Sequence, residues 1–150
     1  MWEKWIGQRS KPVTNPIERG AVAKFAQAIG DDSPLYTDEE AARKSVHGRL
    51  IAPPTYPMIL DYGQIEGLKL PESGLIHGEQ QFDYRRPLYV DEKVTCYETL
   101  RDVKVKQARS GEMTILVIDR VGEDSEGERI FTSTLTIIVT EAVKRRWMAS

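Results

Sequence analysis

Cysteine, histidine and net charge are all scarce in this chain of 150 residues, which has one cysteine, two histidines and a formal net charge of -2. The single cysteine, Cys96, excludes an internal disulfide and a zinc site built from several thiolates, and it is typical of a reducing compartment. The 21 basic and 23 acidic residues leave no overall basic field to attract a nucleic acid. We therefore expect a cytoplasmic protein without a nucleic-acid partner.

Long apolar runs are also missing. No segment approaches the roughly 20 apolar residues that a membrane-spanning helix needs, and residues 1–5 lack the apolar region of a secretion signal. We expect no membrane partner. The chain does contain 40% hydrophobic residues, without repeats or low-complexity tracts. That content is enough for one domain over residues 1–150 that buries roughly 70% of its unfolded surface.

Helix signals dominate the first half of the sequence. Asn15-Pro16 is a typical helix start, and Gly30 is a typical residue just past a helix end. Thr37 with Glu40 forms a second capping pattern. Pro53-Pro54 can begin a third helix but cannot lie inside one. The predicted helices span about residues 16–29, 37–44 and 55–64.

From Gly74 onward the hydrophobic period changes from helical to two, which is typical of strands. The predicted strands span about residues 75–84, 93–107, 112–122 and 129–140. Long antiparallel strands that follow one apolar helix predict an α+β fold, with the sheet wrapped around the helix at 55–64. Because the strands are apolar on both faces, we expect a dimer or a larger assembly. The Lys144-Arg145-Arg146 tail is interpreted as a solvated end.

A polar loop, Gly30-Asp31-Asp32-Ser33-Pro34-Leu35-Tyr36, separates the first two predicted helices. The residue types alone predict a turn in which Asp and Ser side chains accept hydrogen bonds from nearby backbone N–H groups. With its surroundings, Ile-Glu-Arg-Gly…Phe-Ala-x-Ala-Ile-Gly-Asp…Pro-Leu-Tyr-Thr-Asp-Glu-Glu-Ala-Ala…Leu-Ile-Ala-Pro-Pro-Thr, the loop resembles the hydratase motif of the MaoC-like family, which has the hot-dog fold. The resemblance covers roughly residues 5 to 140. Residues 76–88 resemble the first long strand of the motif-poor N-terminal half of double-hot-dog dehydratases, which is related to non-catalytic subunits of acyl-carrier-protein dehydratases.

The resemblance implies catalytic positions at Asp31 and Tyr36, because the family's loop supplies an Asp and a His that act on a water or on the C2/C3 protons of an acyl thioester. The family's central helix then holds the thioester carbonyl with its N-terminal amides. Arg86 is the candidate contact to a phosphorylated carrier such as coenzyme A. The positions implied as substrate-binding are Ser33, Ala52, Pro54, Thr55, Tyr56 and Arg86.

Two departures from the family motif bear on catalysis. Tyr36 stands where the motif has His, and the usual tyrosine pKa near 10 makes it a poor general base at neutral pH. Pro54 stands where the motif has Gly and lacks the N–H that would face the thioester oxygen, so Thr55 or Tyr56 would have to supply that contact. Asp31 is therefore interpreted first as a residue that holds its loop together.

The two histidines offer no replacement for the missing one. His47 is interpreted as a solvated turn residue and His77 as a residue at the start of a strand, and neither has the spacing of a metal ligand. We expect no metal and no cofactor.

Three hypotheses about function follow. The first is a hot-dog subunit of an (R)-3-hydroxyacyl-thioester dehydratase or enoyl-thioester hydratase, which shapes the acyl tunnel while a second hot-dog subunit completes catalysis. The second is a non-catalytic homodimeric module that binds acyl thioesters of coenzyme A or acyl carrier protein. The third is a self-sufficient hydratase that uses Asp31 with Tyr36 or His47.

Overall fold

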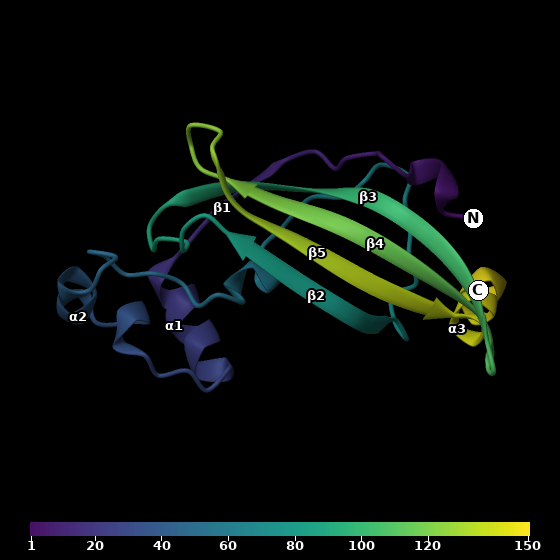
Figure 1. Ribbon diagram of the computed structural model, residues 1–150, viewed down its shortest axis with the longest axis horizontal. Helices are drawn as coiled ribbons and strands as arrows, with labels where there is room; N and C mark the ends of the chain where they lie inside the picture. Colours follow the sequence, from purple (N-terminus) through teal and green to yellow (C-terminus); the bar gives the residue numbers. More distant parts are fainter.

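The computed structural model describes residues 1–150, which form one five-stranded antiparallel sheet with helices at its two ends (Figure 1). The strands are β1 (Val13–Pro16), β2 (Ile76–Tyr84), β3 (Lys93–Ala108), β4 (Gly111–Glu123) and β5 (Arg129–Thr140), in the spatial order β1-β3-β4-β5-β2. The α-helices are α1 (Arg19–Ala28), α2 (Glu39–Lys44) and α3 (Glu141–Ala149). Single 3-10 turns are η1 (Glu3–Trp5), η2 (Pro34–Tyr36) and η3 (Tyr56–Ile59).

The four long strands confirm the prediction from the period of two, and each boundary lies within one residue of the expected one. β3 and β4 form a hairpin in which Ala108 pairs with Gly111, and β5 then pairs with both β4 and β2. β1 escaped prediction because four residues show too little alternation, and its pairing with β3 defines it. β1 and β2 are left as the two edges of the sheet.

Two clusters of buried apolar side chains cover one face of the sheet. The α1 cluster contains Ile17, Val22, Ala26, Tyr36, Ala42, Leu50, Ile51, Ala52, Tyr56, Tyr62, Leu88, Val90, Val94, Cys96, Ile130 and Phe131. The α3 cluster contains Trp2, Ile65, Leu100, Leu116, Ile118, Leu135, Val139 and Val143. Figure 1 shows the corresponding layout, with α1 and α2 beyond one end of the sheet and α3 at the other. The core therefore has two parts.

The first two helices begin later than predicted. α1 begins at Arg19 rather than Pro16, because Pro16 pairs with Lys93 in β1. The Asn15 side chain does not cap this helix, since it exchanges two 2.8 Å hydrogen bonds with the backbone of Asp61. α2 begins at Glu39, and its cap is Asp38, not Thr37.

The predicted helix over 55–64 is wrong. Only the 3-10 turn η3 forms there, and residues 60–75 run as an irregular connection to β2. Gly63 has φ +73°, and a Cβ at this position would lie 2.3 Å from the Lys11 carbonyl oxygen, so the chain turns sharply beside β1. The Tyr62 hydroxyl donates to the Pro57 carbonyl, which a longer helix would use for its own bonds. The sheet therefore does not wrap a long central helix.

The C-terminal tail is a helix and not a free solvated end. Thr140 caps α3 by accepting a hydrogen bond from the Val143 N–H at 3.3 Å. Val143 is buried, and the Trp147 ring stacks on Trp2 with centroids 5.9 Å apart. Of the three basic residues, Arg145 and Arg146 are exposed, as expected, whereas Lys144 lies 3.8 Å from Glu112. None of the helices has the length and apolar character required to span a membrane.

Candidate active site

The loop after α1 brings Asp31, Ser33 and Tyr36 together. Gly30, with φ +73°, ends the helix, and Asp31 Oδ1 accepts a hydrogen bond from the Ser33 N–H at 3.2 Å. Asp31 Oδ2 accepts the Tyr36 hydroxyl hydrogen bond at 3.0 Å. The Ser33 hydroxyl accepts from the Leu35 N–H at 3.4 Å. The expected backbone hydrogen bond of Asp31 is thus present, and both carboxylate oxygens are engaged within the loop.

Tyr36 lies buried in η2 at 7% exposure. Its pKa is raised above the ordinary tyrosine value, first by burial and then by the hydrogen bond to Asp31 and the charge of that carboxylate. The phenol is therefore protonated at neutral pH and acts as a hydrogen-bond donor. Asp31 therefore faces a neutral hydrogen-bond donor, where the family motif has a histidine.

The segment from Ile51 to Tyr56 lies against the same loop. The Ile51 N–H donates to the Leu35 carbonyl at 3.2 Å, and the Ala52 N–H donates to Leu88 at 2.9 Å. Tyr56 is buried, and its ring meets Phe25 of α1 edge to face, with centroids 5.3 Å apart. Ala52 and Tyr56 are therefore structural members of the α1 cluster as well as implied substrate contacts.

Backbone donors are scarce at the start of η3. Pro53 and Pro54 have no N–H, and the Tyr56 N–H is used by the Pro53 carbonyl at 3.0 Å. The Thr55 N–H makes no hydrogen bond within the chain, and Thr55 is exposed. Of the two residues expected to replace the missing amide, Thr55 is therefore the one with a free donor. The Pro54 carbonyl is held in place by the Tyr84 hydroxyl.

Arg86 makes no hydrogen bond or ion pair with the loop and is already paired elsewhere. Its guanidinium donates to both carboxylate oxygens of Glu92, at 2.9 and 2.8 Å, and lies 4.4 Å from the centre of the Tyr89 ring. The hydrogen bond to Glu92 raises the pKa of Arg86 above its usual value. Its charge is compensated within the chain.

His47 is half-buried and His77 exposed, and no cluster of His, Cys, Asp or Glu side chains is arranged to hold a metal ion.

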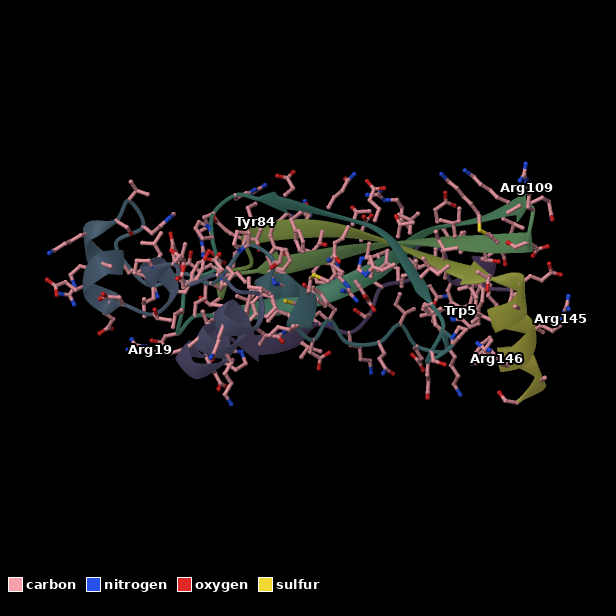
Figure 2. The ribbon with its side chains drawn as sticks, turned by 90° about the horizontal axis from the view of Figure 1, so that it is seen from below. Trp5, Arg19, Tyr84, Arg109, Arg145 and Arg146 are labelled. Carbon is pink, nitrogen blue, oxygen red and sulfur yellow. The ribbon has the colours of Figure 1, made fainter.

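A cavity of about 840 Å³, which the sequence did not reveal, lies at the α3 end. The irregular connection, the inner face of β3 and β4, and α3 surround it, through Gln64, Ile65, Leu68, Lys69, Leu70, Pro71, Glu72, Ser73, Glu98, Ile118, Val143, Arg146, Trp147 and Ser150. None of the residues implied as catalytic or substrate-binding lines it. In Figure 2, Arg146 and Trp5 mark this end, and Tyr84 and Arg19 lie toward the other. The one sequence signal was the apolar character of Leu68 and Leu70, just after the predicted helix that does not form, and of Trp147 near the end of the chain.

Most of the chain matches a known protein family. The FAS1-like dehydratase domain region matches residues 4–133 of the chain. The chain belongs to the FAS1-like dehydratase domain region family. It is also 33% identical to a UPF0336 protein of Streptomyces avermitilis, over 93% of this chain and 95% of that protein.

Solved structures share the fold of this family member. One is a C-terminally truncated HadBC (3R-hydroxyacyl-ACP dehydratase) complex from Mycobacterium tuberculosis, with TM-score 0.78 and 23% identity over 93% of this chain and 100% of that one. Another is a MaoC-like dehydratase from Rhodospirillum rubrum, with TM-score 0.67 and 23% identity over 89% of this chain and 91% of that one. The expected α+β hot-dog fold of the MaoC-like type is confirmed, although the long central helix is absent.

Proposed function

We propose that the chain is a hot-dog subunit of an (R)-3-hydroxyacyl-thioester dehydratase or enoyl-thioester hydratase, with catalysis completed by a second hot-dog subunit. The observation that carries this proposal is the hydrogen bond from the Tyr36 hydroxyl to Asp31, in the position where the family motif has a histidine. Dehydration removes a C2 proton and protonates the C3 hydroxyl, which leaves as water. Tyr36, whose raised pKa keeps its phenol protonated, is a poor general base where the family motif has a histidine, so the proton transfers fall to the partner.

The contribution of this subunit is an acyl-binding groove. Residues 60–75 are irregular, and the inner face of the sheet borders the 840 Å³ cavity, whose lining includes the apolar side chains of Ile118, Leu68 and Trp147. Apolar side chains on three elements suit an acyl chain, since burying each methylene is worth about 0.8 kcal/mol. The substrate class is an acyl thioester of coenzyme A or acyl carrier protein.

The free edge at β2 supports a partner. Its residues from Ile76 to Glu79 are exposed, and its outer side carries backbone N–H and C=O groups that no strand of this chain pairs with. Such an edge is a template for a strand of another sheet. A homo-oligomer or a heterodimer with a second hot-dog subunit would use it, and the structurally similar HadBC is itself a complex.

The proposed site of this activity is the cytoplasm. The single thiol, Cys96, is buried at 0% exposure, and a reducing compartment keeps it free.

Hydration of crotonyl-coenzyme A by the purified chain, alone and with the subunit that co-purifies from the native host, tests the proposal. We expect turnover only in the presence of the partner. Asp31→Asn is compared with Asp32→Asn, a matched control because Asp32 is exposed and makes no side-chain hydrogen bond. Brisk turnover by the chain alone that Asp31→Asn abolishes and Asp32→Asn spares would overturn the proposal in favour of a self-sufficient hydratase.

A second candidate function is a homodimeric acyl-thioester binding module without turnover. The specific observation in its favour is that both Asp31 oxygens are occupied by the Ser33 N–H and the Tyr36 hydroxyl. Saturable binding of acyl thioesters by the homo-oligomer, with no co-purifying subunit and no turnover, would establish it.

A further inference from the structure

A second, smaller cavity lies at the α1–α2 end of the molecule, away from the acyl groove. It measures about 200 Å³ and is formed where the start of α1, helix α2 and the segments 48–50 and 90–91 converge. It is lined by Arg19, Glu39, Arg43, Gly48, Arg49, Leu50, Val90 and Asp91. Three arginines in so small a space are an unusual concentration of positive charge for a chain with a net charge of -2.

Two of these arginines have no acidic partner. Arg19 forms a 2.7 Å ion pair with Glu39, whereas neither Arg43 nor Arg49 has a carboxylate within ion-pair distance. With Asp91 counted, the lining carries three positive and two negative charges, a net charge of +1. The cavity therefore favours an anion.

Arg49 is held in position before any ligand arrives. One of its N–H groups donates to the Val90 carbonyl at 3.2 Å, and its guanidinium lies 4.5 Å from the centre of the Tyr89 ring. The Tyr89 ring is in turn contacted by the Arg86 guanidinium, and the Tyr89 backbone N–H donates a hydrogen bond to the Glu92 carboxylate. A guanidinium fixed in this way loses little conformational freedom on binding, and its remaining donors are free.

We propose that this cavity binds the phosphate ester of a pantetheine thioester, through Arg43 and Arg49. A tetrahedral phosphate group has enough oxygens to accept hydrogen bonds from two arginines on different elements, whereas a carboxylate is satisfied by one. The choice of pantetheine rests on the proposed function and on chain continuity. Leu50 lines the cavity, and the adjacent Ile51 is hydrogen-bonded to Leu35 in the loop of Asp31 and Tyr36. One wall of the cavity is therefore a single residue away from the segment that binds this loop.

Binding of 4′-phosphopantetheine, pantetheine and inorganic phosphate to the full chain at low ionic strength tests the proposal. We expect 4′-phosphopantetheine to bind about tenfold more tightly than pantetheine, and raised salt to reduce this preference. The double variant Arg43→Ala/Arg49→Ala is expected to lose the preference. The matched control is Arg109→Ala/Arg145→Ala, which removes two exposed arginines at the opposite end of the molecule from Arg19 (Figure 2) and is expected to retain it.

The outcomes separate this site from the proposed function. If no pantetheine thioester binds but inorganic phosphate binds in an Arg43- and Arg49-dependent way, the anion site stands and the thioester function fails. Equal affinity for 4′-phosphopantetheine and pantetheine, or a preference that survives the double variant in a folded protein, overturns the site. Comparison of coenzyme A, dephospho-coenzyme A and holo acyl carrier protein then identifies the source. If dephospho-coenzyme A, which lacks the 3′-phosphate, loses the Arg43- and Arg49-dependent binding, the cavity is assigned to coenzyme A. If dephospho-coenzyme A and holo acyl carrier protein retain this binding, the cavity is assigned to the phosphopantetheine ester common to both carriers.

Discussion

Tyr36 donates its hydroxyl hydrogen bond to Asp31 Oδ2 across 3.0 Å, which joins the two ends of the loop that follows α1. The pair occupies the positions of the acid–base pair in the resembling motif, but with a neutral phenol whose pKa is raised. Its geometry serves to hold the loop, and this loop in turn carries the Leu35 carbonyl that binds Ile51. The same side chains therefore connect α1 to the segment that begins η3.

Removing this hydroxyl with Tyr36→Phe is expected to lower the free energy of unfolding by about 1 kcal/mol, because Asp31 Oδ2 loses its donor while the ring stays buried. Urea unfolding measures the change. Tyr97→Phe is the control, since Tyr97 is half-buried and its hydroxyl makes no hydrogen bond within the chain. Equal stability of Tyr36→Phe and Tyr97→Phe would contradict a structural role for the pair.

Restoring activity is expected to require two changes at once. Tyr36→His supplies a group that titrates near neutral pH. Pro54→Gly supplies the missing N–H at the start of η3 and keeps the backbone carbonyl of position 54, which accepts the hydrogen bond of the Tyr84 hydroxyl. Each single variant should gain little hydratase activity with crotonyl-coenzyme A. The double variant should gain more than the two single changes combined, because base and oxyanion donor act on one transition state. Simple additivity would show that the two defects are independent.

The wall of the large cavity at α3 is expected to limit the length of the bound acyl chain. Trp147 lines this cavity and is backed by the fully buried Trp2. Trp147→Ala should shift the preferred acyl thioester to longer chains in a binding series, with about 0.8 kcal/mol per added methylene that becomes buried. Met148→Ala, at an exposed position of the same helix, is the control. Trp147→Leu tests the same wall if the alanine variant loses α3. An unchanged preference for acyl chain length in a folded variant would argue against Trp147 as the wall that limits chain length.

Alkaline pH is expected to destabilise the fold through Cys96. Burial raises the pKa of its thiol from 9.0 to about 12. Between these values the unfolded chain loses the thiol proton and the folded chain keeps it. The stability present below pH 9.0 therefore falls as the pH rises toward about 12. The slope is at most about 1.4 kcal/mol per pH unit. Cys96→Ala should show a shallower decline in unfolding free energy across this window, with the part due to the buried tyrosines Tyr62 and Tyr84 retained. Parallel curves for the two proteins would exclude the thiol as a cause.

Local residue patterns determined the long strands and the polar loop. The period of two from Gly74 onward arises because successive side chains of any strand point to opposite faces of the sheet, whatever that strand pairs with. The same holds for Asp31, whose bond to the Ser33 N–H spans two residues and needs no tertiary contact. The wider pattern around this loop, from Ile17 to Thr55, was likewise sufficient to indicate the MaoC-like hot-dog fold.

Contacts between distant segments decided the rest. The apolar pattern over 55–64 is compatible with a helix, but Gly63 must pass within contact of Lys11 and Tyr62 bonds back to Pro57, so the chain turns instead. α3 gains its stability from Val143 and from the ring of Trp2, which lies at the far end of the sequence. Both cavities form between segments that no local pattern connects. Their existence depends on three-dimensional packing, because a short helix or an irregular segment is stable only when its apolar side chains find a surface elsewhere in the fold.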